Sequence, residues 1–143
     1  MKGNVFCKVT NEVIKATDLL GATTSGAEVL FFGAVRDLND GKKVVSVSYD
    51  GHPLLAEKSF FEISYEAQEK FGSDLDIILI HRLGKLEIGE ISIGIGVKSP
   101  HRDEAYCASR YIIEQVKLRS PIWKEEHYLT GDAAWLPGRA LVL

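Results

Sequence analysis

The sequence contains little cysteine, no long hydrophobic run and no large excess of charge of one sign. Its two cysteines, Cys7 and Cys107, are too few for a disulfide framework or for a zinc site made of four thiolates. The longest apolar run, from Ala27 to Val35, is interrupted by Glu28 and is far shorter than the ~20 residues of a membrane helix. A net charge of -3 excludes a broad basic surface and therefore general nucleic-acid binding, although it allows a local basic pocket.

The composition is typical of one globular domain. Of the 143 residues, 45% are apolar and 26% are charged, and no linker, repeat or low-complexity segment divides them. We therefore treat residues 1–143 as a single domain. The first seven residues lack the apolar stretch of a secretion signal, so we expect a cytoplasmic protein with reduced cysteines.

The apolar pattern predicts strands mixed with helices, in an order without a strict strand–helix–strand rhythm. The strands 27–35 and 44–49 are expected to form a hairpin with its turn at Asp40-Gly41. Such a mixture predicts an α+β fold, with helices on a mainly antiparallel sheet, rather than a doubly wound parallel sheet. The other predicted strands are 5–9, 76–82, 91–97, 122–130 and 133–135, and the predicted helices are 10–20, 53–71 and 100–118, the last with Ser99 as its N-cap residue.

The segment Ser99-Pro-His-Arg102 marks the start of the third predicted helix and places two basic residues there. The first turn of a helix carries unpaired N–H groups and partial positive charge, so basic residues are mildly unfavourable in it. Those N–H groups, the His101 imidazole and the Arg102 guanidinium could together hold a phosphate. The alternative is that both side chains reach solvent or pair with nearby carboxylates, and the motif alone does not decide between the two.

Positive charge also gathers around the predicted end of that helix. Lys117 and Arg119 lie in its last turn, where cations are favoured, and this position explains them without any further role. Lys124 follows Trp123 in an extended segment after Pro121. If the chain folds back, the two lysines share a pocket and lower each other's pKa, so that one can act as base or nucleophile near neutral pH. From spacing alone, ordinary surface lysines are the simpler explanation.

The other reactive residues form no motif of their own. Arg36 ends a predicted strand beside a loop rich in aspartate and glycine, which by itself indicates little. His52 and His81 have no ligand spacing with a cysteine or a carboxylate, so core or surface roles are favoured over metal binding. The sequence contains no nucleophile elbow, Walker loop or dinucleotide fingerprint. Neither a metal nor a cofactor is therefore expected.

Several short segments nevertheless occur in an order that resembles a known family. Together they are similar to the large, catalytic subunit of molybdopterin synthase, over nearly the whole chain from about Val5 to Trp135. Each segment is weak by itself, whereas the ordered set is specific. The segments are Phe32-Gly-Ala-Val-Arg36, His81-Arg82 followed by Gly84, Gly89-Glu90, Ser99-Pro-His-Arg102, and Lys117-x-x-x-Pro121-Ile-Trp-Lys124-x-Glu126.

The resemblance implies a sulfurtransferase of molybdenum cofactor biosynthesis. That family converts a cyclic pyranopterin monophosphate into the dithiolene molybdopterin. The sulfur arrives as a thiocarboxylate on the C-terminal glycine of a small, ubiquitin-like partner subunit, so the enzyme needs no cysteine of its own. The family fold is an α/β-hammerhead with additional antiparallel strands, which agrees with the α+β prediction.

The resemblance also implies residue roles. Arg36, His101 and Arg102 would hold the pterin phosphate, and Lys117 and Lys124 would lie at the reacting carbons. A lysine flanked by cations can donate the proton that a departing oxygen needs, so Lys117 is the leading acid/base or covalent candidate, with Lys124 as its electrostatic partner. Glu125 and Glu126 lie beside the second lysine and are expected in the pocket. The substrate-binding set is thus Arg36, His101, Arg102, Lys117, Lys124, Glu125 and Glu126.

One geometric consequence concerns the third predicted helix. Arg102 and Lys117 are fifteen positions apart on it, about 22 Å at 1.5 Å per residue. A small pterin cannot touch both residues of one chain if the helix is unbroken. We therefore expect a homodimer whose sites combine Lys117 of one chain with His101 and Arg102 of the other, and a heterotetramer once two small subunits bind.

A competing hypothesis uses the same basic residues without catalysis. A small dimeric module could bind a phosphorylated ligand or an acidic protein tail, and it would need no lysine with a perturbed pKa. Arg139, in the C-terminal tail, could add a further cation to the pocket in either case.

Overall fold

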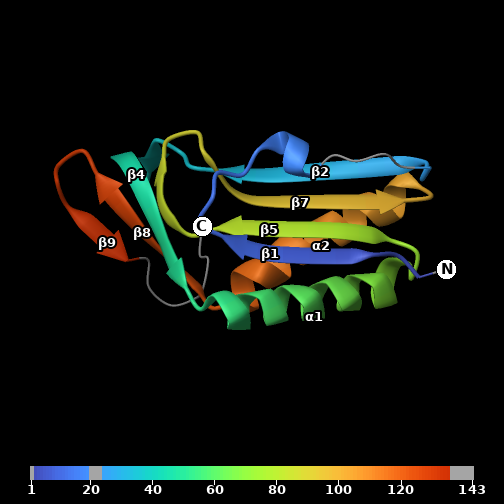
Figure 1. Ribbon diagram of the computed structural model, residues 1–143. Helices are drawn as coiled ribbons and strands as arrows, with labels where there is room; N and C mark the ends of the chain where they lie inside the picture. The colour runs from blue at the N-terminus through green and yellow to red at the C-terminus, as the bar shows by residue number, and fades with distance from the viewer. Residues whose placement is uncertain (1, 20–23, 136–143) are drawn as a thin grey trace.

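In the part of the chain that the structure describes, two β-sheets and two α-helices form the fold (Figure 1). The computed structural model describes residues 2–19 and 24–135, so Arg139 and the rest of the C-terminal tail lie outside the described residues. The four-stranded sheet is called the larger sheet here, because its strands contain more residues in total than the five strands of the other sheet. Its strand order is β1-β5-β7-β2, with β1 parallel to β5 and the other neighbours antiparallel. Its strands are β1 (Val5–Thr10), β5 (Asp76–Arg82), β7 (Ile91–Ser99) and β2 (Ala27–Ala34).

The second sheet is built around one long strand, β4, and extends from one end of the larger sheet, at the left of Figure 1. Strand β4 pairs with β3, β6 and β8, all antiparallel, and β8 pairs in turn with β9. The bounds are β3 (Leu38–Asn39), β4 (Lys42–Gly51), β6 (Gly84–Glu87), β8 (Ile122–Tyr128) and β9 (Ala133–Trp135).

The predicted hairpin of 27–35 with 44–49 is wrong, because β2 and β4 belong to different sheets. Strand β2 pairs with β7, and β4 forms its hairpin with the two-residue strand β3. The turn itself lies where the sequence placed it. Asp40 and Gly41 have φ values of 49° and 75°, the left-handed pair that a two-residue hairpin loop requires.

Helices α1 (Pro53–Phe71) and α2 (Arg102–Arg119) pack against each other and against the larger sheet. The bounds of α1 match the prediction, because Pro53 suits the first helical turn and Gly72 ends the helix. Its first apolar pair, although apolar in sequence, lies outside the core. Leu54 is 79% and Leu55 52% exposed, and the buried stripe begins at the next residue, Ala56.

The predicted helix over 10–20 is wrong as far as the described residues extend. Only a single 3-10 turn, η1 (Ala16–Asp18), forms there, and the Thr10 hydroxyl oxygen accepts the Glu12 N–H at 3.0 Å in a bend. The end of this segment covers the face of the larger sheet opposite the helices. Leu19 is fully buried there, and a Cβ added at Gly94 would lie 2.5 Å from its Cδ1.

Helix α2 begins two residues later than the sequence predicted. Ser99 is the last residue of β7, where it pairs with Ala27, and His101 rather than Ser99 is the N-cap residue. The strand pairing fixes Ser99 in an extended conformation, and this tertiary constraint overrides its local capping preference.

The architecture confirms the predicted α+β class, with helices on a mainly antiparallel sheet. None of the helices in residues 2–19 and 24–135 has both the length and the apolar character to cross a membrane.

Candidate functional site

A cavity of about 320 Å³ opens where the two sheets meet the C-terminal end of α2. Four charged side chains from different parts of the sequence line it. They are Arg36, just after β2, Lys117 in the last turn of α2, and Lys124 and Glu126 on β8. The structure therefore brings together four of the seven residues that the sequence proposed for substrate binding.

Strand alternation explains why two residues of β8 face this cavity. Pro121 follows the end of α2, and the chain then runs extended, so residues at every second position share one face. Lys124 and Glu126 face the cavity, and in the strand register they lie opposite Tyr49 and Val47 of β4. Folding back after the helix thus places the second lysine near the first.

Both lysines have lowered pKa values. Burial is the main cause of the lowered Lys117 pKa, and the charges of Lys124 and Arg36 add to it. Burial also lowers the pKa of Lys124, which is only 8% exposed, and Arg36 lowers it further, whereas Glu126 opposes the shift. A lysine with a lowered pKa can exchange a proton nearer to neutral pH.

Glu126 is a buried carboxylate that three side chains contact. Its Oε1 accepts hydrogen bonds from Asn39 Nδ2 at 2.6 Å and from the Tyr128 hydroxyl at 3.2 Å. Its Oε2 lies 3.8 Å from Lys124 Nζ. The sequence did not single out Asn39 or Tyr128, because neither belongs to a recognisable motif.

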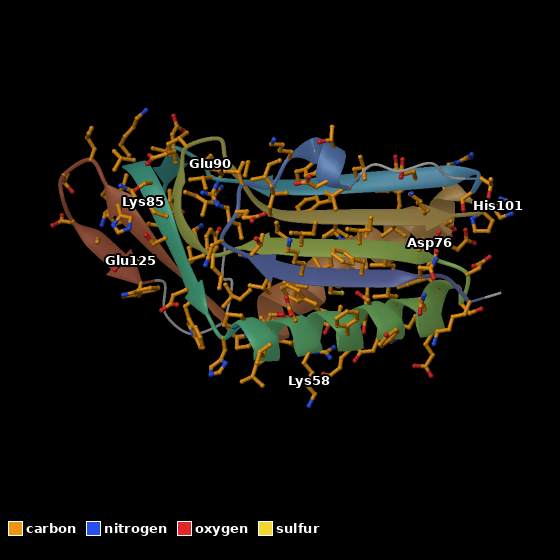
Figure 2. All side chains as sticks on the ribbon, in the orientation of Figure 1. Lys58, Asp76, Lys85, Glu90, His101 and Glu125 are labelled. Carbon is orange, nitrogen blue, oxygen red and sulfur yellow. The ribbon has the colours of Figure 1, made fainter. Side chains whose placement is uncertain are left out.

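Three other proposed site residues do not reach the cavity of their own chain. His101 and Arg102 lie at the opposite end of α2, which runs without a break from Arg102 to Arg119, and Figure 2 shows His101 at the far end of the larger sheet. Glu125 alternates with its neighbours on β8 and points to the other face, where its Oε1 lies 3.4 Å from His127 Nε2.

The wall of the cavity includes residues that the sequence did not assign to the site, namely Tyr49, His81 and Ser92. The Tyr49 and His81 rings pack edge to face at 5.0 Å. Burial raises the pKa of Tyr49, and a hydrogen bond with Ser92 opposes that shift. His81 is buried, as a core histidine would be, and its Nδ1 donates to the Arg82 carbonyl at 2.8 Å. That bond leaves Nε2 unprotonated in the neutral ring.

An ion pair beside the cavity joins two of the short segments found in the sequence, His81-Arg82 and Gly89-Glu90. Arg82 pairs with Glu90, whose carbonyl accepts the Val35 N–H at 3.0 Å. The Val35 carbonyl accepts the Gly89 N–H at 2.9 Å, and Gly89 has a φ of 86°. The turn from Gly89 to Glu90 therefore fixes the backbone immediately before Arg36.

We expect His81 to make the stability of the protein depend on pH. Burial lowers its pKa to about 4, from the ordinary 6.5. Between those values the unfolded chain binds more protons, so the free energy of unfolding should fall by about 3 kcal/mol as the pH drops from 6.5 to 4. Urea denaturation at a series of pH values measures this slope.

His81→Gln should flatten the slope over that interval, since it removes the buried group that titrates there. His52→Gln, at an exposed histidine, is the matched control and should keep the wild-type slope. An unchanged slope in His81→Gln would contradict the assignment of this dependence to His81.

The arrangement suits an anionic substrate that needs proton transfer. Arg36, Lys117 and Lys124 supply positive charge, and the apolar wall, which includes Phe31 and Ile113, can hold a planar ring. Within residues 2–19 and 24–135, no group of histidine, cysteine and acidic side chains is placed to hold a metal ion.

Comparisons with known proteins converge on one family. The family model described as MoaE protein matches residues 9–119. A protein of Synechococcus elongatus named molybdopterin synthase catalytic subunit is 45% identical over 116 residues, which cover 81% of this chain and 70% of that protein. A Nostoc protein of the same name is 35% identical over 131 residues, covering 92% and 78%.

Solved structures agree with the sequence matches. The crystal structure of molybdopterin synthase from Staphylococcus aureus superposes with a TM-score of 0.84 at 33% identity, covering 92% of this chain and 96% of that one. A structure from Helicobacter pylori, described as a complex of subunits 1 and 2 of molybdopterin-converting factor, has a TM-score of 0.73 at 22% identity, covering 90% and 88%. At that identity the second match supports the fold alone.

Proposed function

The chain belongs to the MoaE protein family of molybdopterin synthase catalytic subunits, and we propose that its cavity is the site of sulfur transfer. The sulfur donor is the C-terminal thiocarboxylate of a small ubiquitin-like subunit ending in Gly-Gly. The acceptor is cyclic pyranopterin monophosphate, and the product is the dithiolene of molybdopterin. The observation that carries the proposal is the convergence of Lys117, Lys124 and Arg36, each from a different part of the sequence, on one cavity.

The chain's own residues supply charge and protons in this reaction. As the thiocarboxylate sulfur forms a bond to a pterin carbon, an oxygen leaves that carbon and needs a proton. Lys117 donates that proton, since burial and the neighbouring cations lower the pKa of its amine. Water then hydrolyses the resulting thioester, which releases the small subunit with an ordinary C-terminal carboxylate, and a second thiocarboxylate delivers the second sulfur in the same way. Lys124 keeps the cavity positive, and Arg36, the exposed cation at its mouth, binds an anionic group of the substrate.

Neither cysteine of the chain supplies the sulfur in this proposal. Cys7 is buried next to Ser64, with Sγ and Oγ 3.6 Å apart, and burial raises the pKa of its thiol to about 11. Cys107 is exposed on α2, and neither residue lines the cavity. An inert thiol and a distant one fit an enzyme whose sulfur arrives on its partner subunit.

A second copy of the chain completes the substrate site in our proposal. His101 and Arg102 are exposed at the end of α2 remote from their own cavity. In a two-fold symmetric dimer they can reach the cavity of the partner chain, where they would bind the pterin phosphate. Two small subunits then bind to the dimer as a heterotetramer. Residues 1–143 act as one domain, and the reaction takes place in the cytoplasm.

The test is reconstitution of the reaction. The protein is incubated with cyclic pyranopterin monophosphate and a thiocarboxylated small subunit, and formation of the dithiolene is followed. A small subunit that ends in an ordinary carboxylate is the control and should give no product. Absence of product from the thiocarboxylated subunit, while a reference synthase works, would overturn the proposal. Binding of the pterin without conversion would instead support a non-catalytic binding module.

A further inference from the structure

The two oxygens of the Glu126 carboxylate have different environments. Oε1 accepts hydrogen bonds from Asn39 and from Tyr128, at 2.6 Å and 3.2 Å. Oε2 faces Lys124 across 3.8 Å, which is longer than an N–H···O hydrogen bond. The ion pair is thus held open although both residues are buried, at 3% and 8% exposure.

An open ion pair between buried groups needs an explanation. Attraction between opposite charges strengthens as water is excluded, so a free carboxylate here would close onto the ammonium. The donors on Oε1 supply the opposing constraint, because moving the carboxylate toward Lys124 would stretch both of those hydrogen bonds.

The hairpin holds Asn39 in place for this role. Asn39 pairs with Lys42 across a two-residue turn, and the positive φ values of Asp40 and Gly41 define that turn tightly. Asn39 and Glu126 are 87 positions apart, so their contact joins the tip of the β3–β4 hairpin to β8.

We propose that Asn39, assisted by Tyr128, is a positioning residue that keeps Glu126 from closing its ion pair with Lys124 and so leaves the Lys124 ammonium free to engage the substrate. This inference rests on the proposed function, since it concerns how Lys124 is made available for it. The other charged groups that act on Lys124 are Arg36 and Lys117, which both repel it, and Tyr49 of β4 is its partner in the strand register.

The first measurement does not depend on activity. The pH dependence of Lys124 acylation by acetic anhydride, followed by peptide mass spectrometry, reports the pKa of its amine. In Asn39→Ala, Glu126 should close on Lys124, and the midpoint of labelling should rise by about one pH unit. Asp37→Asn is the matched control, because it removes the exposed Lys43–Asp37 contact of the same hairpin, and it should leave the midpoint unchanged.

The second measurement is the turnover of the reconstituted holoenzyme. Asn39→Ala should lower kcat at neutral pH by about tenfold, with a smaller change in KM, because a Lys124 ammonium paired closely with Glu126 no longer supplies its full positive charge beside Lys117 in the chemical step. Tyr128→Phe removes a single hydroxyl and should shift both readouts in the same direction but less. This milder variant keeps the test decisive if Asn39→Ala does not fold.

A double variant separates positioning from a general structural role. If Asn39 acts through Glu126, then Asn39→Ala combined with Glu126→Gln should be no less active than Glu126→Gln alone. The inference would be overturned if the activity losses of the two substitutions multiply in the double variant. It would also be overturned if the pH midpoint of Lys124 acylation is unchanged in both Asn39→Ala and Tyr128→Phe. Full activity of Lys124→Ala would instead overturn the role of Lys124 in the proposed function, so the two failures are distinguishable.

Discussion

Replacing Lys117 by alanine is expected to lower kcat for dithiolene formation by about 10³-fold, within the range found when a general acid or base is removed. Lys117 lines the cavity from the last turn of α2, and burial, together with Lys124 and Arg36, lowers the pKa of its amine. The variant loses both the proton donor and a positive charge. Steady-state kinetics of the reconstituted synthase, with saturating thiocarboxylated small subunit, measures the loss.

Two further variants show whether the loss comes from proton transfer, from charge, or from the removal of any helical lysine. Lys117→Arg keeps the charge but not an exchangeable proton near neutral pH, so it should be almost as inactive as alanine if proton transfer is the essential role. Lys58→Ala is the control for loss of a lysine from a helix, because Lys58 is exposed on α1 and points away from both sheets (Figure 2). Wild-type kcat in Lys117→Ala would contradict the assignment.

The elements that the sequence predicted well are those with local signals at their ends. Pro53 and Gly72 bound α1, and Asp40-Gly41 forms the turn that this residue pair favours. The pairing of strands was not accessible in the same way. Strand β2 pairs with β7, whose residues lie 57 to 72 positions further along the chain, and nothing local to β2 distinguishes that partner from the nearer β4.

The same distinction applies to the site. Lys117 and Lys124 could be placed together because a helix end, a proline and an extended segment follow one another within eight positions. Side chains of a strand alternate between its two faces, so Glu126 shares the face of Lys124 and Glu125 does not. This difference could have been predicted from the sequence. Asn39 could not be found in this way, because its contact with Glu126 depends on how two distant strands meet β4.

Mixing two inactive variants should restore activity if the site combines two chains. Lys117→Ala and Arg102→Ala each damage every site in their own homodimers. In a mixed dimer, one site carries both damaged residues and the other carries neither. With random exchange half of the dimers are mixed, so activity should recover to about a quarter of the wild-type value. Differently tagged chains, refolded together and purified through both tags, isolate the mixed dimer for assay.

A second mixture provides the matched control. Lys117 and Lys124 line the cavity of the same chain, so Lys117→Ala mixed with Lys124→Ala leaves a damaged residue in every site and should recover nothing. Recovery of activity in both mixtures would indicate contamination by wild-type chains. Recovery in neither would contradict the proposal that each site combines two chains. The unbroken α2 makes the first result the expected one, because fifteen helical positions put Arg102 about 22 Å from Lys117 of its own chain. A pterin held by both residues therefore needs Arg102 from another copy.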